Sequence, residues 1–250
     1  MVAQTPNIDP RELEQFEALA TQWWDLDGPF AMLHRLGPPR LGVIRDAATR
    51  HFPAAGAGRR ILKGLACLDI GCGGGLIAEP LARLGGTVTA IDPAAGNIEA
   101  ARIHAEATGL TIDYRATTAE DLAATGATFD LVTCLEVIEH VPDQAAFVAT
   151  IAGLLKPGGL VVFSTLNRSP KSYALAIVGA EYVLGWVPRG THDWRRFVTP
   201  EELNRYAEKA GLVDFESEGI IYDPLRDQWR RSSDDGVNYM ATAARPALIA

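Results

Sequence analysis

The chain has 250 residues, a hydrophobic content of 48% and a formal net charge of −8. This length suits one α/β domain with additions or at most two small domains, and the acidity without a long basic run disfavours a nucleic-acid partner. No apolar run reaches the roughly 18 residues of a membrane-spanning helix, and the first residues lack the basic and apolar regions of a signal peptide. The three cysteines lack metal-type spacing. We therefore expect a cytoplasmic protein.

Residues 7–52 carry a helical pattern, with apolar side chains recurring at helical spacing. Gly28-Pro29 and Gly37-Pro38-Pro39 predict breaks in this pattern, because proline removes a backbone donor and clashes with the preceding turn. A second helix is then expected over about 40–52. We therefore expect residues 1–58 to form a helical extension or cap.

The chain from residue 59 onward alternates between strand and helix patterns, which predicts a parallel sheet with right-handed crossovers. We expect residues 59–250 to form a Rossmann-like α/β domain with a mostly parallel seven-stranded sheet, helices on both faces and a helical insertion over 167–198. Thr199 and Glu202 predict a capping box that starts a helix after the insertion. The predicted strands lie near 65–70, 87–91, 111–115, 129–134, 159–165, 212–222 and 236–244, and the predicted helices of the core near 75–85, 95–109 and 143–155.

A glycine loop follows the first predicted strand, and an acid ends the second. Gly71 and Gly73 leave the backbone bare, so a ligand can approach it closely, and Asp92 can accept both hydroxyls of a ribose. A dinucleotide fingerprint would require a third glycine where Leu76 stands. Asp69 would repel a diphosphate but suits an ammonium or sulfonium group. The loop therefore predicts an S-adenosylmethionine site.

Two glutamates and a histidine follow the fourth predicted strand. Spacings of three and four would put Glu136, Glu139 and His140 on one side of a helical turn. Such a set can hold a divalent cation, and its hard oxygen ligands favour Mg²⁺, which could bind two adjacent ring oxygens and lower a phenol pKa. Alternatively, His140 is a general base or a pocket wall in an enzyme without a metal. The pattern by itself leaves both interpretations open.

Several selective segments make the chain similar to a known family. It resembles the ubiquinone-biosynthesis O-methyltransferases, which are class I S-adenosylmethionine-dependent methyltransferases, over nearly its whole length. The resemblance implies methylation of catechol-like phenolic hydroxyls on polyprenylated rings, at both O-methylation steps of the pathway, and a place in a complex of ubiquinone-biosynthesis proteins. The segments that carry it are the glycine loop, Trp23-Trp24-Asp25, Pro39-Arg40-Leu41, Glu136-Val137-Ile138-Glu139-His140, Thr165-Leu166-Asn167-Arg168, Gly190-Thr191-His192-Asp193 and Val237-Asn238-Tyr239-Met240.

The resemblance also implies roles for residues outside the glycine loop. It places Arg40 on the cofactor carboxylate, where a guanidinium could bind in bidentate fashion. It places an acid on the adenine amine, for which we favour Glu120 over Asp121, and Leu135 against the adenine ring, where relatives can carry methionine. Because it includes Glu136, it also favours the Mg²⁺ interpretation.

The insertion combines an apolar helical face with basic flanks. Such a segment is typical of an interfacial helix. We expect residues 168–196 to contact the anionic surface of a membrane, on the inner face of that membrane. A lid that packs on the protein itself is the alternative. His192 and Asp193 could reach the active site or form a buried turn, and we assign them no role. The apolar residues are Tyr173, Ile177, Ala180, Leu184 and Val187, and the basic ones are Arg168, Lys171, Arg189, Arg195 and Arg196.

Three other functions are compatible with parts of the sequence. A methyltransferase acting on a soluble phenol would use the insertion as an ordinary lid. A cofactor-binding scaffold would bind the nucleoside without turnover, although the acidic cluster disfavours this. A nicotinamide oxidoreductase is disfavoured by Leu76.

Overall fold

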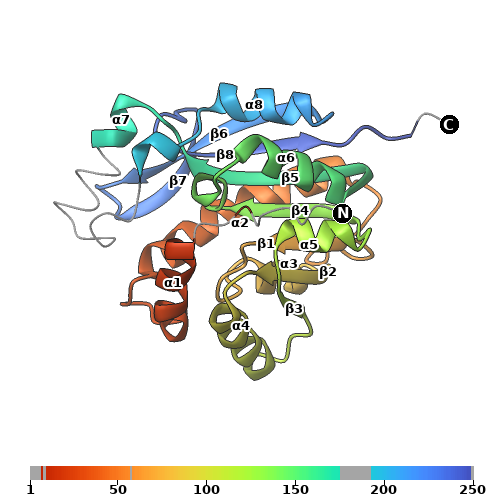
Figure 1. The fold of residues 1–250 in the computed structure, drawn as a ribbon, viewed down its shortest axis with the longest axis horizontal. Coiled ribbons are helices and arrows are strands. Elements are labelled where there is room, and N and C mark those ends of the chain that lie inside the picture. The colour runs from red at the N-terminus through yellow and green to blue at the C-terminus, as the bar shows by residue number, and fades with distance from the viewer. Residues whose placement is uncertain (1–6, 8–9, 57, 175–192, 249–250) are drawn as a thin grey trace.

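The protein is built around one eight-stranded sheet (Figure 1). The computed structural model describes residues 7, 10–56, 58–174 and 193–248. The strand order is β3-β2-β1-β4-β5-β8-β6-β7, with the first five strands parallel and the last three antiparallel to their neighbours. The strands are β1 (Ala66–Ile70), β2 (Thr87–Asp92), β3 (Asp113–Ala116), β4 (Phe129–Leu135), β5 (Leu155–Leu166), β6 (Val213–Asp223), β7 (Gln228–Ser232) and β8 (Asn238–Ala244).

The predicted Rossmann-like α/β fold is confirmed, and the sheet has one strand more than the seven expected. The additional strand is β7, which forms an antiparallel hairpin with β6 at the edge of the sheet. Its sequence, Gln-Trp-Arg-Arg-Ser, has a single apolar residue, so the alternation that identifies a half-buried strand is missing. Pairing with β6 creates this strand, and periodicity could not predict it.

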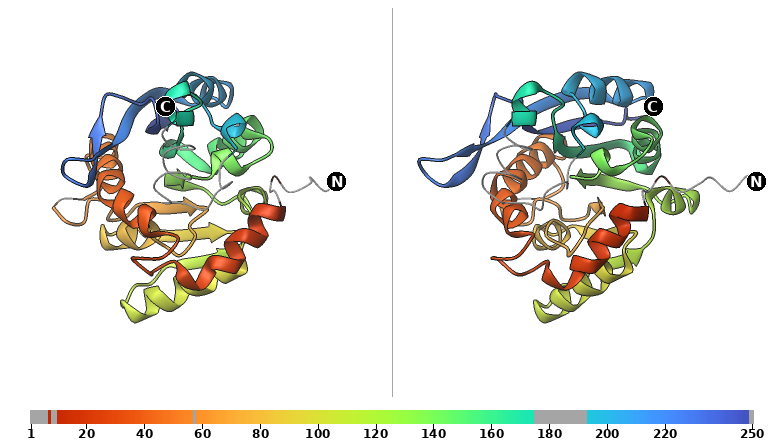
Figure 2. Two further views of the ribbon diagram at one scale, coloured as in Figure 1. Left: turned by 90° about the vertical axis from the view of Figure 1, so that its left-hand side faces the viewer. Right: turned by 60° about the vertical axis from the view of Figure 1, so that its left-hand side comes forward.

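Helices cover both faces of the sheet (Figure 2). One hydrophobic cluster lies under α5, α6 and α8, and the other lies under α2, α3 and α4. Successive residues of β1 face opposite clusters, with Leu68 in the first and Cys67 in the second, as the pleat requires. The helices are α1 (Pro10–Leu19), α2 (Ala31–His51), α3 (Ala78–Arg83), α4 (Ala95–Ala107), α5 (Ala119–Ala124), α6 (Gln144–Leu154), α7 (Pro170–Ser172) and α8 (Pro200–Lys209), with the 3₁₀ turns η1 (Ala20–Gln22), η2 (Ile138–His140) and η4 (Trp194–Arg196).

The N-terminal helices differ from the prediction at one point. The expected break at Gly37-Pro38-Pro39 is wrong, because α2 continues through both prolines from Ala31 to His51. Burial of its apolar face, including Leu36, Val43 and Ile44, compensates for the backbone hydrogen bonds that proline removes. The predicted capping box at Thr199 and Glu202 is confirmed at the start of α8.

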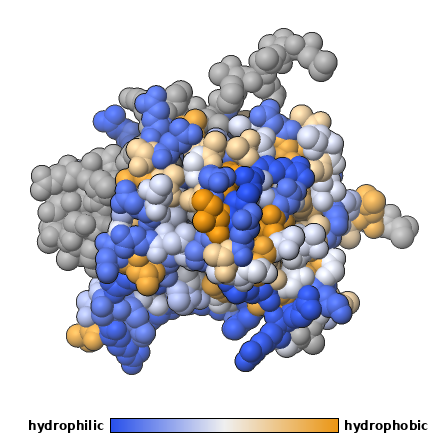
Figure 3. All heavy atoms as spheres, turned by 90° about the horizontal axis from the view of Figure 1, so that it is seen from below, coloured by the Kyte–Doolittle hydropathy of each residue, from blue (hydrophilic) through white to orange (hydrophobic). Residues whose placement is uncertain are grey.

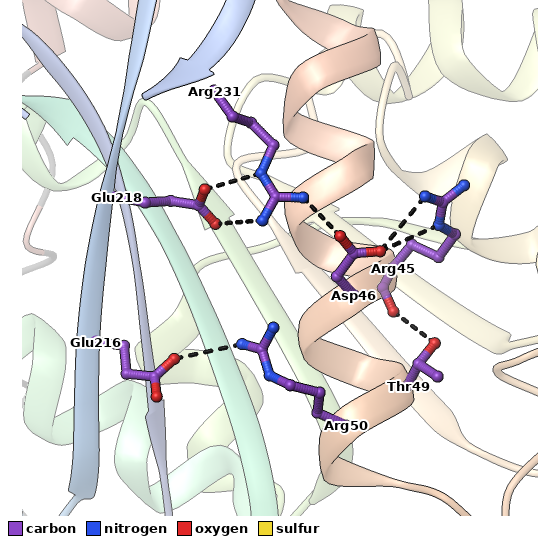
Figure 4. A network of polar contacts seen from close by, with 7 residues as sticks. All are labelled: Arg45, Asp46, Thr49, Arg50, Glu216, Glu218 and Arg231. Carbon is purple, nitrogen blue, oxygen red and sulfur yellow. Dashed lines mark hydrogen bonds and ion pairs between the residues drawn. The ribbon is translucent and has the colours of Figure 1, made fainter. Parts of the chain in front are cut away.

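Ion pairs fasten α2 to the β6–β7 hairpin (Figure 4). Arg231 of β7 binds Glu218 of β6 through two hydrogen bonds of 2.8 and 2.9 Å and Asp46 of α2 through one of 2.6 Å. Hydrogen bonding to Arg231 lowers the pKa of Asp46. The helix that carries Arg40 is thereby held against the far end of the sheet.

Among the residues that the structure describes, no helix is both long and apolar enough to cross a bilayer. The face seen from below is mixed, with apolar groups lying between hydrophilic ones (Figure 3).

Candidate cofactor and active site

The glycine loop follows β1 at the carboxyl edge of the parallel strands. Gly71 and Gly73 have positive φ angles of 67° and 50°, which favour glycine. A Cβ at Gly71 would lie 2.3 Å from Cγ2 of Val137, and one at Gly73 would lie 2.4 Å from the ring of Trp23. The space on the Cβ side of each glycine is filled by the protein, so at these positions the missing side chain makes room for Val137 and Trp23.

Asp92 joins the end of β2 to the glycine loop. Its Oδ2 accepts a hydrogen bond of 3.0 Å from the Gly73 N–H, and its Oδ1 accepts one of 2.9 Å from Ala94 and one of 3.2 Å from Nδ2 of Asn97. Its side chain is buried, and burial raises its pKa despite these three donors. The carboxylate thus lies where strand order predicts it, beside the loop.

Asp69 lies inside β1 beneath the loop. Its Oδ1 accepts a hydrogen bond of 2.7 Å from Oγ1 of Thr133 on the adjacent β4. Its Oδ2 accepts no well-formed hydrogen bond from the described residues, although the nearby Ala78 N–H favours the charged form. Burial raises the pKa of Asp69 to about 7. A buried carboxylate oxygen without a donor is chemically suited to a cationic group.

Arg40 and Glu136 form a pair between α2 and the end of β4. Nη2 of Arg40 lies 2.5 Å from Oε1 of Glu136, which also accepts a hydrogen bond of 2.6 Å from Oγ of Ser164. Arg40 is only 4% exposed, and its Nε has no hydrogen-bond partner among the described residues. The family resemblance linked Arg40 to the cofactor, and the sequence pattern linked Glu136 to a metal, but the structure brings these two side chains together.

The three predicted metal ligands form no metal-binding group in this conformation. Glu139 is buried and accepts a hydrogen bond of 2.8 Å from Oγ1 of Thr165, while Glu136 is bound to Arg40. Within the described residues, no group of three histidine, cysteine, aspartate or glutamate side chains could hold a metal ion. The argument from helical spacing is therefore wrong. Glu136 has a φ of 56° directly after β4, and only the 3₁₀ turn Ile138–His140 follows.

Glu139 is nevertheless electrostatically unusual. Burial and the neighbouring charge of Glu136 raise its pKa to about 7, and the proximity of His140 opposes this shift. His140 itself is partly exposed at the end of η2, at the same carboxyl edge of the sheet.

The remaining predicted residues lie around this edge. Glu120 is partly buried in the first turn of α5, which Thr118 caps by accepting a hydrogen bond from the Asp121 N–H. The Thr117 N–H donates to the carbonyl oxygen of Asp92, so the start of α5 is tied to the end of β2. Leu135 is buried at the end of β4.

Sequence reasoning missed the polar role of the tryptophan pair and of Asn97. Nε1 of Trp23 donates to Oδ1 of Asn97 at 2.8 Å, and Nε1 of Trp24 donates to the Gly74 carbonyl at 3.0 Å. Trp24 also stacks on His104 of α4 at a ring distance of 3.4 Å. In the sequence, the tryptophans were part of the segment Trp23-Trp24-Asp25 that carries the family resemblance, and neither side chain was assigned a role. An asparagine in the first turn of the helix after Asp92 was the available signal.

The predicted membrane segment lies mostly outside the described residues, including Ile177, Leu184 and His192. At its described ends, Arg168 pairs with Glu202 and Lys171 pairs with Asp234. Asp193 caps the turn η4 by accepting a hydrogen bond from the Arg195 N–H.

Known proteins similar to this chain include methyltransferases. Residues 42–217 match the family model described as a methyltransferase domain. The ubiquinone biosynthesis O-methyltransferase of Methylobacterium sp. (strain 4-46) is 54% identical over 242 residues, covering 97% of each chain. The enzyme of that name from Methylocella silvestris is 53% identical, covering 96% of this chain and 95% of the relative.

Among solved structures, magnesium protoporphyrin IX methyltransferase of Synechocystis PCC 6803, described with bound SAM, superposes with a TM-score of 0.61. It is 17% identical, with 98% of this chain and 100% of that chain covered, so the likeness concerns the fold alone. The extent and level of identity to the curated relatives establish that this chain belongs to the family of ubiquinone biosynthesis O-methyltransferases.

Proposed function

We propose that the protein transfers the methyl group of S-adenosylmethionine to phenolic hydroxyls of polyprenylated ring intermediates of ubiquinone biosynthesis, at both O-methylation steps. The observation that carries this proposal is the position of Asp92. In a chain of this family, its carboxylate closes β2 and binds the Gly73 N–H of the glycine loop. An acid at this point suits a ribose diol, and the adjacent loop suits the remainder of the cofactor.

The cofactor would lie along the carboxyl edge of the sheet. In our proposal Asp92 accepts the ribose hydroxyls, the backbone of Gly71 and Gly73 contacts the methionine and ribose parts, and Asp69 faces the ammonium group. Oδ2 of Asp69, which lacks a well-formed hydrogen bond from the described residues, supports the last assignment, because a buried carboxylate oxygen gains most from a charged donor. Nε of Arg40, which is also unpartnered, supports a contact with the cofactor carboxylate.

The adenine ring would lie between α5 and the end of β4. Glu120 would accept a hydrogen bond from the exocyclic amine, and Leu135 would cover one face of the ring. Their support is the link between Thr117 and Asp92, which brings the start of α5 next to the proposed ribose position. We further propose that residues 1–58 act as a helical extension capping the domain of residues 59–250.

Methyl transfer requires a nucleophilic phenolate aligned with the methyl carbon and the sulfur. The phenol oxygen forms a bond to the methyl carbon while the carbon–sulfur bond breaks, and the sulfonium leaves as a neutral thioether. An unperturbed phenol has a pKa of about 10, so a base must accept its proton near neutral pH. We propose His140 as that base, because it is a partly exposed imidazole at this edge.

Magnesium enters the proposal only through the family resemblance. The conformation described here does not fit an ion held by Glu136, Glu139 and His140, since Glu136 binds Arg40 and Ser164 and Glu139 binds Thr165. We route no step through a metal. Activity that is lost in chelator and restored by Mg²⁺ would show that this set rearranges around an ion. Activity indifferent to chelator would leave His140 as the base.

A polyprenyl tail places the substrate in a bilayer, so we propose that residues 168–196 contact an anionic membrane surface on its inner face. The support is the amphipathic sequence with basic flanks. Because Arg168 and Lys171 are paired with acids, their own contribution to the attraction would be reduced. Association with other ubiquinone-biosynthesis proteins is a further proposal from the resemblance.

Liposome flotation tests the membrane proposal. We expect the protein to float with vesicles containing anionic lipid and not with neutral vesicles. The double variant Ile177→Asp plus Leu184→Asp should abolish flotation. Flotation that survives this change would contradict the interfacial helix.

A methylation assay tests the function. The protein is incubated with isotopically labelled S-adenosylmethionine and a short-chain prenylated catechol, and the products are identified by mass spectrometry. We expect one methyl group on one catechol oxygen. Faster turnover of a catechol without the prenyl chain would favour a soluble substrate, and cofactor binding without product from either substrate would favour a scaffold.

A further inference from the structure

A chain of two hydrogen bonds connects the N-terminal region to the proposed ribose acceptor. Nε1 of Trp23 donates to Oδ1 of Asn97 at 2.8 Å, and Nδ2 of Asn97 donates to Oδ1 of Asp92 at 3.2 Å. All three side chains are buried, with Asn97 only 1% exposed. Water is therefore a poor substitute for any of these partners.

The chemistry of the three groups fixes the direction of the chain. An indole N–H can only donate, so the amide of Asn97 must turn its oxygen toward Trp23. The amide nitrogen then faces Asp92, which as a carboxylate can only accept. Without the indole N–H, the opposite amide orientation would lose one of its two penalties, while the repulsion between the amide oxygen and the carboxylate would remain. Trp23 thus strengthens the preference for the amide orientation that donates to Asp92.

Trp23 is itself held in a single position. Its ring stacks on Phe30 with a centroid distance of 3.8 Å and an interplanar angle of 1°, and its carbonyl lies 2.8 Å from Nε2 of His34. The same ring lies against Gly73 and Gly74, where an added Cβ would come within 2.4 Å of it. A rigid indole between the glycine loop and α4 can therefore hold the Asn97 amide in one orientation.

We propose that Trp23 is a positioning residue which acts through Asn97 to hold the Asp92 carboxylate in the orientation that receives the cofactor's ribose hydroxyls. This inference rests on the proposed function, and in particular on the ribose role of Asp92. The N-terminal region would thereby help the protein to select cofactors that carry both ribose hydroxyls. The hydrogen bonds between Asp92 and the cofactor depend on these two hydroxyls and not on the rest of the ligand.

Calorimetry on the full-length protein tests the proposal with two ligands. One is S-adenosylhomocysteine, and the other is its analogue lacking both ribose hydroxyls. We expect the wild type to prefer the first, and Trp23→Phe, which keeps an aromatic ring but removes the N–H, to weaken that binding about tenfold. Binding of the dideoxy analogue should change less than about twofold, because the interaction that Trp23 supports is absent from that complex.

Two further variants separate the relay from packing. Asn97→Ala should weaken the binding of S-adenosylhomocysteine more than that of the dideoxy analogue, as Trp23→Phe does. If both residues act through the same series of hydrogen bonds, the double variant should bind S-adenosylhomocysteine little more weakly than Asn97→Ala alone. Trp229→Phe, a tryptophan of the distant strand β7, is the control and should leave both affinities unchanged. In turnover, Trp23→Phe should raise KM for S-adenosylmethionine while kcat at saturation is retained.

Each adverse outcome has a distinct meaning. Equal weakening of both ligands by Trp23→Phe, with circular dichroism showing a native fold, would overturn the relay and leave Trp23 as a packing residue. Independent, additive losses from Trp23→Phe and Asn97→Ala would overturn it as well. A wild type that does not distinguish the two ligands would instead refute the ribose role of Asp92, and with it this part of the proposed function.

Discussion

At the scale of single residues, buried carboxylates dominate the site. Asp69 and Asp92 lie on neighbouring strands, and both have a pKa raised by burial. Their environments differ in one respect. Asp92 receives three hydrogen bonds, whereas Oδ2 of Asp69 lacks a well-formed one. Asp92 is thus preorganised by the protein, and Asp69 retains the capacity for an incoming donor.

Replacing Asp92 should impair cofactor binding more than chemistry. In Asp92→Asn, one carboxylate oxygen becomes a donor that cannot accept from the ribose or from Gly73. We expect KM for S-adenosylmethionine to rise about 10- to 100-fold in steady-state assays, with a smaller effect on kcat. Asp113→Asn, an exposed acid on neighbouring β3, is the matched control. An unchanged KM in a folded Asp92→Asn protein would contradict the assignment.

Asp69 makes a testable contribution to pH-dependent stability. Its folded pKa of about 7 lies above the ordinary 3.8, so the folded state holds the proton more tightly than the unfolded state. The resulting stabilisation is complete below about pH 4 and is lost as the pH rises toward 7, with a magnitude on the order of a few kcal/mol.

Urea unfolding of cofactor-free protein between pH 4 and 8 measures this effect. Asp69→Asn mimics the protonated acid, so the wild type should lose more stability than this variant as the pH rises. Glu106→Gln, a change at an exposed acid, should follow the wild type. Parallel profiles for the wild type and Asp69→Asn would show that Asp69 is ionised in the folded protein at low pH.

At the scale of elements, sequence patterns located the parallel strands within a few residues because most of them are largely buried and apolar, although in β3 only Tyr114 is buried. The errors arose where tertiary contacts replace periodicity. The helix α2 continues through Pro38 and Pro39 because it packs on the sheet, and β7 exists because β6 pairs with it. The acidic cluster after β4 was placed on a helical turn, but Glu136 instead adopts a positive φ and meets Arg40 from α2. That contact spans 96 residues of sequence and could not be read from local spacing.

The contact between α2 and the hairpin should contribute measurably to stability. Arg231→Gln removes a cation that binds two acids on two elements, and we expect a loss of about 1 kcal/mol in the free energy of unfolding because the network is partly exposed. The double variant with Asp46→Asn should lose less than the sum of the two single changes. Arg45→Gln removes a longer and more exposed pair and should have a smaller effect. Strict additivity would indicate that Arg231 and Asp46 do not interact in solution.

At the scale of the whole molecule, the N-terminal region and the glycine loop form one continuous structure. Trp23 fills the space beside Gly73, Trp24 binds the Gly74 carbonyl, and Arg40 reaches the end of β4. The sequence predicted the loop and its acids as a nucleoside site because these residues follow one another closely along the chain. It did not show that the N-terminal region packs on that loop, since the partners lie about 50 to 96 residues away in the sequence.

A crystal structure with S-adenosylhomocysteine tests the central claim most directly. The account predicts both ribose hydroxyls within hydrogen-bond distance of the Asp92 carboxylate, with the ammonium group beside Asp69 and the Trp23 ring still on Gly73. A ribose bound elsewhere, or no ligand at this edge of the sheet at saturating concentration, would contradict it.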